Sequence, residues 1–230
     1  INVFQRAPYL FNWGGEYSNL LHMENITPRR SSINITEQLL RWYDAHQRIL
    51  PWRAVGRETP DPYRVWLSEI MLQQTQVVTV LSYFNRFIEL WHKIENLAAA
   101  DLNEVLREWA GLGYYARARN LHRCAQIITL DHAGEFPKEE AELLKLPGIG
   151  PYTAAAMAAI AFGKDATPVD GNVERVIARV YRIKTPIKEN KLIIKSLASQ
   201  NTPKSRTGDY AQAVMDLGAT VCTPRRPLCF

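Results

Sequence analysis

The order of hydrophobic and polar positions along the chain predicts short α-helices. From Thr36 onward, apolar residues recur every three or four positions, and no segment alternates apolar and polar residues as a half-buried strand would. Glycine, proline and polar residues separate the segments. The pattern predicts an all-α fold, with helices over residues 36–50, 62–72, 77–91, 102–110, 116–130, 138–145, 152–162, 172–183, 188–199 and 208–217.

Two helix starts carry capping signals. Pro62 follows Asp61 and occupies the first helical turn, where the backbone N–H that proline lacks has no helical partner anyway. Thr75 precedes the apolar stretch that starts at Val77 and is a favourable N-cap residue. We therefore expect the preceding helix to break at residues 73–75.

The first part of the chain lacks such patterns. Residues 1–22 show neither helical nor strand spacing, and the first methionine is Met23. We expect residues 1–35 to be a disordered or non-native N-terminal segment, with the native start at Met23.

Composition narrows the class of protein. The 230-residue chain has 47% hydrophobic and 22% charged residues, which are ordinary globular values, and no apolar run long enough to span a bilayer. Its formal charge of +5 and pI of about 9.1 favour a polyanionic partner such as nucleic acid. We expect a soluble protein without membrane association.

Cysteine usage favours a reducing compartment. The chain has three cysteines, an odd number, and no pattern typical of a secretory signal. We expect an intracellular protein, in the cytoplasm or nucleoid of a prokaryote, or in the nucleus or mitochondrion of a eukaryote.

A glycine-containing turn lies between two predicted helices. In L-P-G-I-G (146–150), Gly148 and Gly150 can adopt backbone conformations closed to other residues and let a phosphate approach the amides at the start of the next helix. Taken alone, the turn is more typical of an ordinary helix–helix connection than of a phosphate-binding hairpin. An alanine-rich helix and the loop P-V-D-G-N (168–172) follow it.

Five short motifs follow one another along the chain. They are L-P-W-R (50–53), W-L-S-E-I-M-L-Q-Q-T-Q-V (66–77), G-L-G-Y-Y-A-R (111–117), L-P-G-I-G-P-Y-T-A (146–154) and V-D-G-N-V (169–173). Together they resemble the MutY family of adenine DNA glycosylases, in the helix-hairpin-helix DNA glycosylase superfamily, from about residue 39 to residue 230. The resemblance implies a six-helix barrel with the hairpin over residues 59–170, and an iron-sulfur cluster lobe made of residues 36–58 and 171–230.

Two carboxylates are the candidate catalytic groups. Cleaving an N-glycosidic bond requires an acid for the leaving base and an anion near the sugar as positive charge develops. The resemblance implies that Glu69 protonates adenine N7 and helps to activate water, and that Asp170 stabilises the cationic sugar. The apolar neighbours Trp66 and Ile70 predict a raised pKa for Glu69. Asp170 also stands where a helix N-cap is expected, which is compatible with that role.

Two further residues belong to the implied site. Tyr152 stands where bifunctional relatives resembling endonuclease III carry a lysine that forms a Schiff base, so the resemblance implies a monofunctional enzyme with Tyr152 near the deoxyribose. It also implies that Asn172 forms a hydrogen bond with the catalytic region. A packed core aromatic is the alternative for Tyr152.

The resemblance also implies DNA contacts. Gln74 and either Tyr114 or Tyr115 would enter the base stack, Arg53 would lie near the pocket, and Gly148 and Gly150 would contact a phosphate. Core packing is the alternative for the tyrosines, and a surface ion pair is the alternative for Arg53. Three arginines recur along one predicted helix and are candidates for phosphate contact or for a solvated face: Arg117, Arg119 and Arg123.

Cys222 and Cys229 lie seven positions apart near the end of the sequence. Alone, this spacing fits a disulfide, half of a zinc site, or chance. The resemblance implies that they are two of four thiolate ligands of a [4Fe-4S] cluster in the full-length protein. With only two of four ligands in the given chain, we do not expect it to hold the cluster stably.

These features predict a monomeric base-excision-repair enzyme. Its partner would be double-stranded DNA containing adenine mispaired with 8-oxoguanine or guanine. Two alternatives remain: a glycosylase of the same fold acting on thymine or uracil in G mismatches, and a non-catalytic DNA-binding helix-hairpin-helix protein. Glu69 weighs against the first, and the joint presence of Glu69, Tyr152 and Asp170 weighs against the second.

Overall fold

The computed structural model describes residues 35–56 and 58–228. All regular elements in these two ranges are helices and none is a strand, which confirms the predicted all-α fold. The helices are α1 (Ile35–His46), α2 (Pro62–Met71), α3 (Val77–Leu90), α4 (Ile94–Ala99), α5 (Leu102–Glu108), α6 (Ala116–Asp131), α7 (Glu140–Leu143), α8 (Pro151–Ile160), α9 (Gly171–Val180), the 3-10 helix η2 (Ile187–Glu189), α10 (Lys191–Asn201) and α11 (Thr207–Thr220).

The segment predicted to be disordered or non-native, residues 1–35, lies outside the described residues except for Ile35. Residues 1–34 are not described, and Ile35 is the first residue of α1. The prediction for residues 1–34 therefore stays a prediction.

The helix starts show one correct capping prediction and one error. Asp61 Oδ1 accepts a hydrogen bond of 2.9 Å from the backbone N–H of Tyr63, so Asp61 caps α2 as predicted. Thr75 does not cap α3, because the N-cap residue is Gln76. The Thr75 hydroxyl instead donates to the carbonyl of Gln73 (3.3 Å) and stabilises the preceding turn. The sequence pattern also missed α4, which has only six residues.

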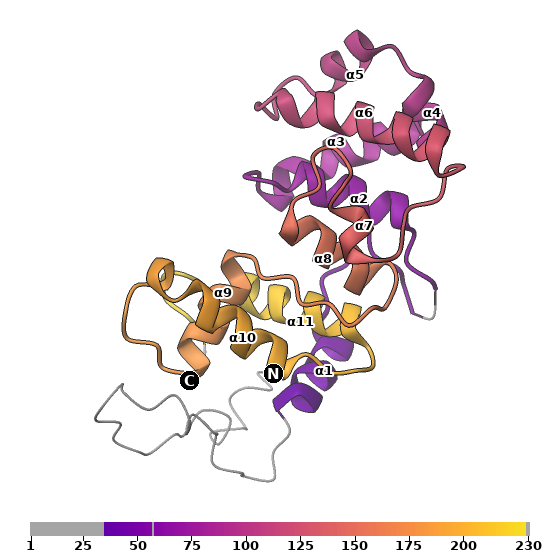
Figure 1. The fold of residues 1–230 in the computed structure, drawn as a ribbon. Helices are drawn as coiled ribbons and strands as arrows, with labels where there is room; N and C mark the ends of the chain where they lie inside the picture. Colours follow the sequence, from indigo (N-terminus) through magenta and orange to yellow (C-terminus); the bar gives the residue numbers. More distant parts are fainter. Residues whose placement is uncertain (1–34, 57, 229–230) are drawn as a thin grey trace.

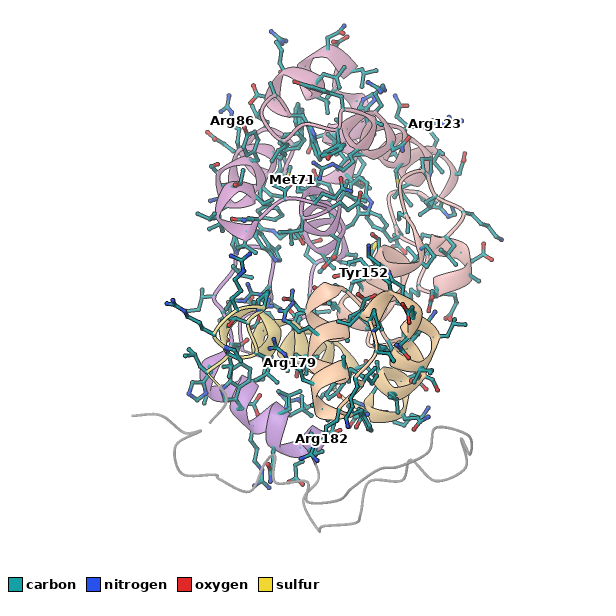
Figure 2. The ribbon with its side chains drawn as sticks, turned by 90° about the vertical axis from the view of Figure 1, so that its left-hand side faces the viewer. Met71, Arg86, Arg123, Tyr152, Arg179 and Arg182 are labelled. Carbon is teal, nitrogen blue, oxygen red and sulfur yellow. The ribbon has the colours of Figure 1, made fainter. Side chains whose placement is uncertain are left out.

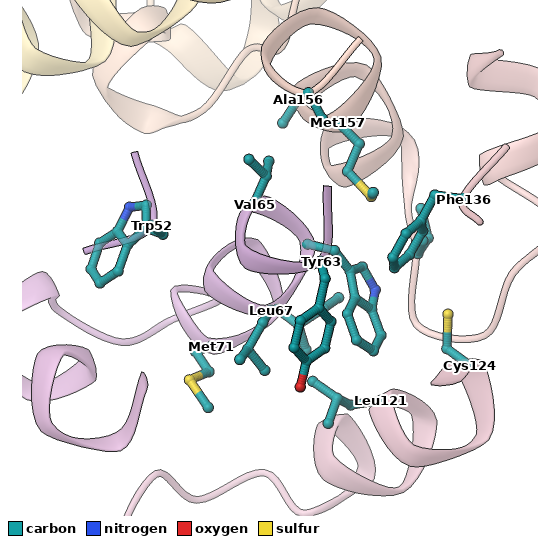
Figure 3. Packing of buried hydrophobic residues seen from close by; sticks show 14 of the residues in the cluster. Trp52, Tyr63, Val65, Leu67, Met71, Leu121, Cys124, Phe136, Ala156 and Met157 are labelled. Carbon is teal, nitrogen blue, oxygen red and sulfur yellow. The ribbon is translucent and has the colours of Figure 1, made fainter. Parts of the chain in front are cut away.

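The helices form two groups, each around its own hydrophobic core (Figure 1). The first group runs from α2 to α8, and its largest fully buried side chains include Trp66, Phe84 and Trp109. Figure 3 shows part of this packing, where Tyr63 and Met71 of α2 lie among side chains from other segments. Leu50 and Trp52, which precede α2, also pack into this core.

The second group joins the two ends of the described chain. Helix α1 packs against α11, and α9 packs against both α10 and α11. Helix α11 also packs against α8 of the first group. Gly208 permits this approach, because a Cβ there would lie 2.8 Å from the carbonyl oxygen of Ala159. The contact between α8 and α11 fixes the two groups against each other where the candidate site lies.

Candidate functional site

A cleft with a volume of about 840 Å³ is lined by residues from both helix groups. Six of the predicted site residues line it: Arg53, Glu69, Gln74, Tyr152, Asp170 and Asn172. Figure 2 places Tyr152 at the level where the two groups meet. Residues more than 100 positions apart in the sequence are thus brought to one cleft, as a site assembled from several motifs requires.

Glu69 lies on the cleft-facing side of α2 and is only 8% exposed. Burial raises the pKa of its carboxyl group to about 7, and the negative charge of Asp170 acts in the same direction. A hydrogen bond from the Tyr152 hydroxyl and the positive charge of Arg53 oppose the rise. Trp66, Ile70 and Met71 are buried around this part of α2, in agreement with the predicted apolar surroundings. Glu69 can therefore hold or release a proton near neutral pH.

Tyr152 is the second residue of α8 and packs against both hydrophobic cores. Its hydroxyl lies 4.0 Å from the sulfur of Met215 on α11. Burial, together with the negative charges of Glu69 and Asp170, raises the pKa of the phenol well above its ordinary value. Tyr152 therefore stays neutral and serves as a hydrogen-bond donor beside Glu69.

Asp170 is the N-cap residue of α9, as its sequence position suggested. Its Oδ1 accepts a hydrogen bond of 2.8 Å from the backbone N–H of Val173. Its Oδ2 accepts another of 2.8 Å from the side-chain amide of Asn172. Two donors thus hold the Asp170 carboxylate in one orientation at the cleft.

Arg175 extends this hydrogen-bond network and was not identified from the sequence. One of its Nη atoms donates to Asn172 Oδ1 (2.6 Å) and to the carbonyl of Gly218 (2.8 Å), while Nε donates to the carbonyl of Cys222 (2.7 Å). Asn172 is therefore fixed from both ends of its amide group. The sequence did contain a sign of this contact. Asn172 and Arg175 are three positions apart in one predicted helix, and residues at that spacing are neighbours on the helix surface.

Arg53 lines the cleft but has a protein partner. Its side chain is 8% exposed, and the guanidinium group donates two hydrogen bonds to the carboxylate of Asp216 on α11, at 2.7 and 2.8 Å. Asp216 is fully buried, and it also accepts from the backbone N–H and Nε of Arg48. The alternative considered for Arg53 from the sequence was a surface ion pair. The structure shows an ion pair, but a buried one.

The predicted hairpin connects α7 and α8. Gly148 has φ of +77°, and a Cβ there would lie 3.0 Å from the Cβ of Asn120, so both the backbone and the space favour glycine. Gly150 is the N-cap residue of α8 with an extended backbone, and Pro151 is the first residue of that helix. Both glycines are exposed, so the amides at the start of α8 can be approached from solvent.

The predicted base-stack residues lie on two turns. Gln74 is exposed in the turn between α2 and α3 and lines the edge of the cleft. Tyr114 and Tyr115, which are 66% and 44% exposed, precede α6 and do not appear among the described residues that line the cleft. Their exposure excludes the alternative of core packing.

The three arginines of α6 do not share one environment. Arg119 and Arg123 are exposed, as a phosphate contact or a solvated face would require. The guanidinium group of Arg117 instead donates to protein oxygens, including the carbonyls of Met71 (3.0 Å) and Leu112 (2.9 Å). The prediction that Arg117 contacts a phosphate was wrong, because its guanidinium group already forms hydrogen bonds within the protein.

Of the two candidate cluster ligands, only Cys222 belongs to the described residues, and Cys229 lies outside them. Cys222 is buried, and its sulfur lies 3.2 Å from an Nη atom of Arg179, which also donates to the carbonyl of Thr223. Within the described ranges, no three His, Cys, Asp or Glu residues are grouped so as to hold a metal ion. One buried thiol does not fit a four-thiolate cluster, so the cluster stays a prediction.

None of the helices that the structure describes is long and apolar enough to cross a membrane.

Comparisons with known proteins give one family and several relatives. Residues 67–199 match the family model described as HhH-GPD superfamily base excision DNA repair protein. The adenine DNA glycosylase of Mus musculus is 46% identical over 201 residues, a match that covers 83% of this chain and 38% of the relative. The chain thus spans about two fifths of the length of that relative.

Two solved structures resemble the fold. A thermostable thymine-DNA glycosylase matches with a TM-score of 0.72 and 30% identity, over 84% of this chain and 88% of that one. A non-covalent endonuclease III–DNA complex matches with a TM-score of 0.68 over 84% of this chain and 87% of that one, but at 23% identity it shows the fold alone. Together the comparisons confirm the resemblance to adenine DNA glycosylases and the predicted helix-hairpin-helix glycosylase fold.

Proposed function

Because the chain belongs to the HhH-GPD superfamily of base excision DNA repair proteins, we propose that it removes adenine mispaired with 8-oxoguanine or guanine by hydrolysing the N-glycosidic bond. In this proposal the protein acts inside the cell as a monomer on double-stranded DNA. The adenine must leave the base stack before it reaches the cleft, which costs a few kcal/mol in general.

Glu69 is the acid in this proposal. With a pKa of about 7, its carboxyl group is protonated in a large fraction of molecules near neutral pH. Transfer of that proton to adenine N7 allows the C1′–N9 bond to break, and the bonding electron pair leaves on the base. The Glu69 carboxylate then accepts a proton from the water that adds to C1′. This step restores the acid and leaves an abasic sugar.

Asp170 and Tyr152 act on the sugar. The carboxylate of Asp170, held by Asn172 and by the N–H of Val173, places a fixed negative charge near the cation that forms at C1′. Tyr152 supplies a neutral phenol in place of the lysine that would form a Schiff base. We therefore propose a monofunctional enzyme that releases adenine without cutting the strand.

The exposed residues serve DNA binding in this proposal. Gln74 and one of Tyr114 and Tyr115 enter the stack and fill the space that the adenine leaves. Base–aromatic stacking contributes about 1–3 kcal/mol in general, which suits an exposed tyrosine. Gly148 and Gly150 allow a DNA phosphate to approach the N-terminus of α8, where free amides and the helix dipole favour an anion.

The buried carboxyl group of Glu69 beside Asp170 is the observation that carries the proposal. Single-turnover assays with duplexes containing adenine opposite 8-oxoguanine, adenine opposite guanine, thymine opposite guanine and uracil opposite guanine test it. We expect release of adenine from the first two duplexes and no strand cleavage before alkali treatment. A protein that binds all four duplexes but releases no base would be the non-catalytic alternative.

A thymine or uracil glycosylase is the second candidate function. The match to a thymine-DNA glycosylase, at 30% identity over 88% of that chain, favours it. The desolvated acid of Glu69 weighs against it, because an acid placed for a purine nitrogen has no equivalent N7 in a pyrimidine. Release of thymine or uracil, without any release of adenine, would establish this candidate in the same assay.

A further inference from the structure

Arg117 is a partly buried cation that takes no part in the ion pairs of the described residues. Its guanidinium group is surrounded by neutral oxygens and rings. Burial accordingly lowers its pKa relative to a free arginine. Arg119 and Arg123 on the same helix are exposed. A cation held in this way needs a structural reason, because burying charge is unfavourable unless hydrogen bonds replace the lost water.

The first set of contacts lies at the end of α2. One Nη atom of Arg117 donates to the carbonyls of Ile70 (3.2 Å), Met71 (3.0 Å) and Gln73. The other donates to the hydroxyl of Thr75 (3.3 Å). The three carbonyls lie at the C-terminus of α2 and in the turn that follows it, where a cation is favoured. Because Gln73 and Thr75 flank Gln74, Arg117 contacts the chain on both sides of Gln74, through the carbonyl of Gln73 and the side-chain hydroxyl of Thr75.

The second set of contacts lies in the turn before α6. The second Nη atom also donates to the carbonyl of Leu112 (2.9 Å). The guanidinium lies over the rings of Trp109 and Tyr114, at 5.3 and 5.7 Å from the ring centroids. The backbone N–H of Arg117 donates to the carbonyl of Tyr114 (2.8 Å). A single side chain thus contacts two turns that are about forty positions apart in the sequence.

Both turns carry an exposed residue in a strained conformation. Gln74 has φ of +58° and Tyr114 has φ of +46°, a region that costs a residue with a side chain about 1 kcal/mol or more. Such conformations persist only where the surroundings fix them. The contacts of Arg117 with Gln73, Thr75, Leu112 and Tyr114 supply that fixation.

We propose that Arg117 is a positioning residue that sets Gln74 and Tyr114 as one preformed pair for entry into the DNA base stack. This inference rests on the proposed function, in which these two residues replace the extruded adenine. It also selects Tyr114, rather than Tyr115, as the partner of Gln74, because the guanidinium lies over the ring of Tyr114.

The planar, multi-donor shape of arginine is essential to this arrangement. The guanidinium reaches five acceptors at the end of α2 and in the two turns, whereas a lysine ammonium has three donors at one point and cannot span them. Arg117→Lys therefore keeps the charge but separates the two turns. Arg119→Lys and Arg123→Lys are matched controls, since their side chains are exposed on the same helix.

A double-mutant cycle tests the inference. Gln74→Ala, Tyr114→Ala and the double variant are made in the wild-type protein and in the Arg117→Lys protein. Opening of the stack is followed by the fluorescence of 2-aminopurine next to adenine opposite 8-oxoguanine. We expect the two alanine effects in the wild-type protein to deviate from additivity by on the order of tenfold in the opening equilibrium. In the Arg117→Lys protein we expect them to be additive, and in the Arg119→Lys control the coupling should persist.

A second measurement separates positioning from a general loss of structure. Arg117→Lys should slow adenine release from the paired duplex at least tenfold more than release from an unpaired, bulged adenine, whereas a misfolded site would slow both equally. If Arg117→Lys does not fold, Thr75→Val, which removes one acceptor, replaces it and should reduce the coupling in part. Equal coupling with and without the arginine overturns the inference. A wild-type protein that opens the stack but releases no adenine overturns the proposed function instead.

Discussion

The side-chain amide of Asn172 donates a hydrogen bond of 2.8 Å to Asp170 Oδ2, so Asn172 fixes the orientation of the Asp170 carboxylate. The amide is itself held, because its oxygen accepts from Arg175 (2.6 Å). A fixed carboxylate needs little reorganisation when positive charge develops nearby, which is the condition for effective electrostatic stabilisation. The position of the Asp170 carboxylate therefore depends on the hydrogen bond from Asn172.

Asn172→Ala should slow adenine release without preventing folding. A hydrogen bond to a charged group is worth about 1.5–3 kcal/mol, which corresponds to a loss of roughly 10- to 100-fold in the single-turnover rate. Glu174→Gln on the same helix is the control, since Glu174 pairs with Lys191 and does not line the cleft. A rate within twofold of wild type for Asn172→Ala would show that Asp170 does not depend on this hydrogen bond.

Glu69→Gln and Asp170→Asn should each abolish adenine release while leaving DNA affinity nearly unchanged. Each change preserves the size of the side chain and removes the carboxyl group that the proposed chemistry needs. Single-turnover rates and equilibrium binding to the same duplex provide the measurement. Release by either variant at a rate near that of wild type would contradict the role assigned to that residue.

The rate of adenine release should depend on pH through Glu69. Because burial raises the pKa of Glu69 to about 7 and the reaction uses its protonated form, the single-turnover rate should be constant below pH 7. Above pH 7 it should fall by up to tenfold per pH unit. DNA affinity measured over the same pH range is the control. A rate that stays constant up to pH 9 would exclude Glu69 as the rate-determining acid.

The same pKa shift affects stability. The pKa of Glu69 is 4.5 in the unfolded chain and about 7 in the folded protein, so the folded protein binds the proton more tightly. The free energy of unfolding is therefore highest below pH 4.5 and falls as the pH rises towards 7. The loss reaches about 3 kcal/mol at most. Glu69→Gln should therefore gain stability over wild type between pH 4 and pH 8 in urea denaturation. The exposed Glu89→Gln variant should show no such gain.

Local signals in the sequence were sufficient for most of the fold. Proline at the start of a helix, as at Pro62, and aspartate before it, as at Asp61 and Asp170, mark starts that depend only on neighbouring residues. The short helix α4 lacks such a start. Its N-cap residue is Lys93, which is not a typical capping residue. The backbone N–H of Lys93 donates to the side chain of Asn96 (3.2 Å), so Asn96 was the one local sign of a helix start.

The site was predictable only where its residues lie in contiguous motifs. Glu69, Asp170 and Asn172 occur in such motifs, and the cleft brings them together. The partners of Arg53 and Arg117 could not be predicted, because they depend on packing between distant segments. Asp216 lies 163 positions after Arg53, and the acceptors of Arg117 are mostly backbone carbonyls, which any residue type carries.

Gly218→Ala should impair the site through Asn172. A Cβ at position 218 would lie 2.6 Å from the Cβ of Asn172, a distance that real side chains do not adopt, so α11 or Asn172 must move. The movement should weaken the hydrogen bond to Asp170 and slow adenine release by on the order of tenfold. Gly171→Ala is the matched control, because a Cβ there meets nothing within 4 Å. Equal effects of the two changes would refute the steric explanation.

Asp216→Asn should destabilise the protein far more than a comparable surface change. Asp216 is fully buried and pairs with Arg53 and Arg48, so neutralising it leaves the buried guanidinium of Arg53 without its counterion. Breaking a buried pair in this way costs about 3 kcal/mol or more. Asp165→Asn is the matched control, because Asp165 is exposed and pairs with Lys204, an arrangement worth about 1 kcal/mol or less.

The effect of Asp216→Asn should also depend on pH. Burial raises the pKa of Asp216, but the hydrogen bonds and charges of Arg53 and Arg48 outweigh burial and hold it below the ordinary value of 3.8. A depressed pKa contributes stability that is present above the unfolded value and is lost as pH falls through the folded one. Urea denaturation should therefore show the full difference between wild type and Asp216→Asn at pH 7 and a smaller one at pH 3. A difference that stays the same at both pH values would show that the loss comes from altered packing and not from the charge that joins α11 to the segment before α2.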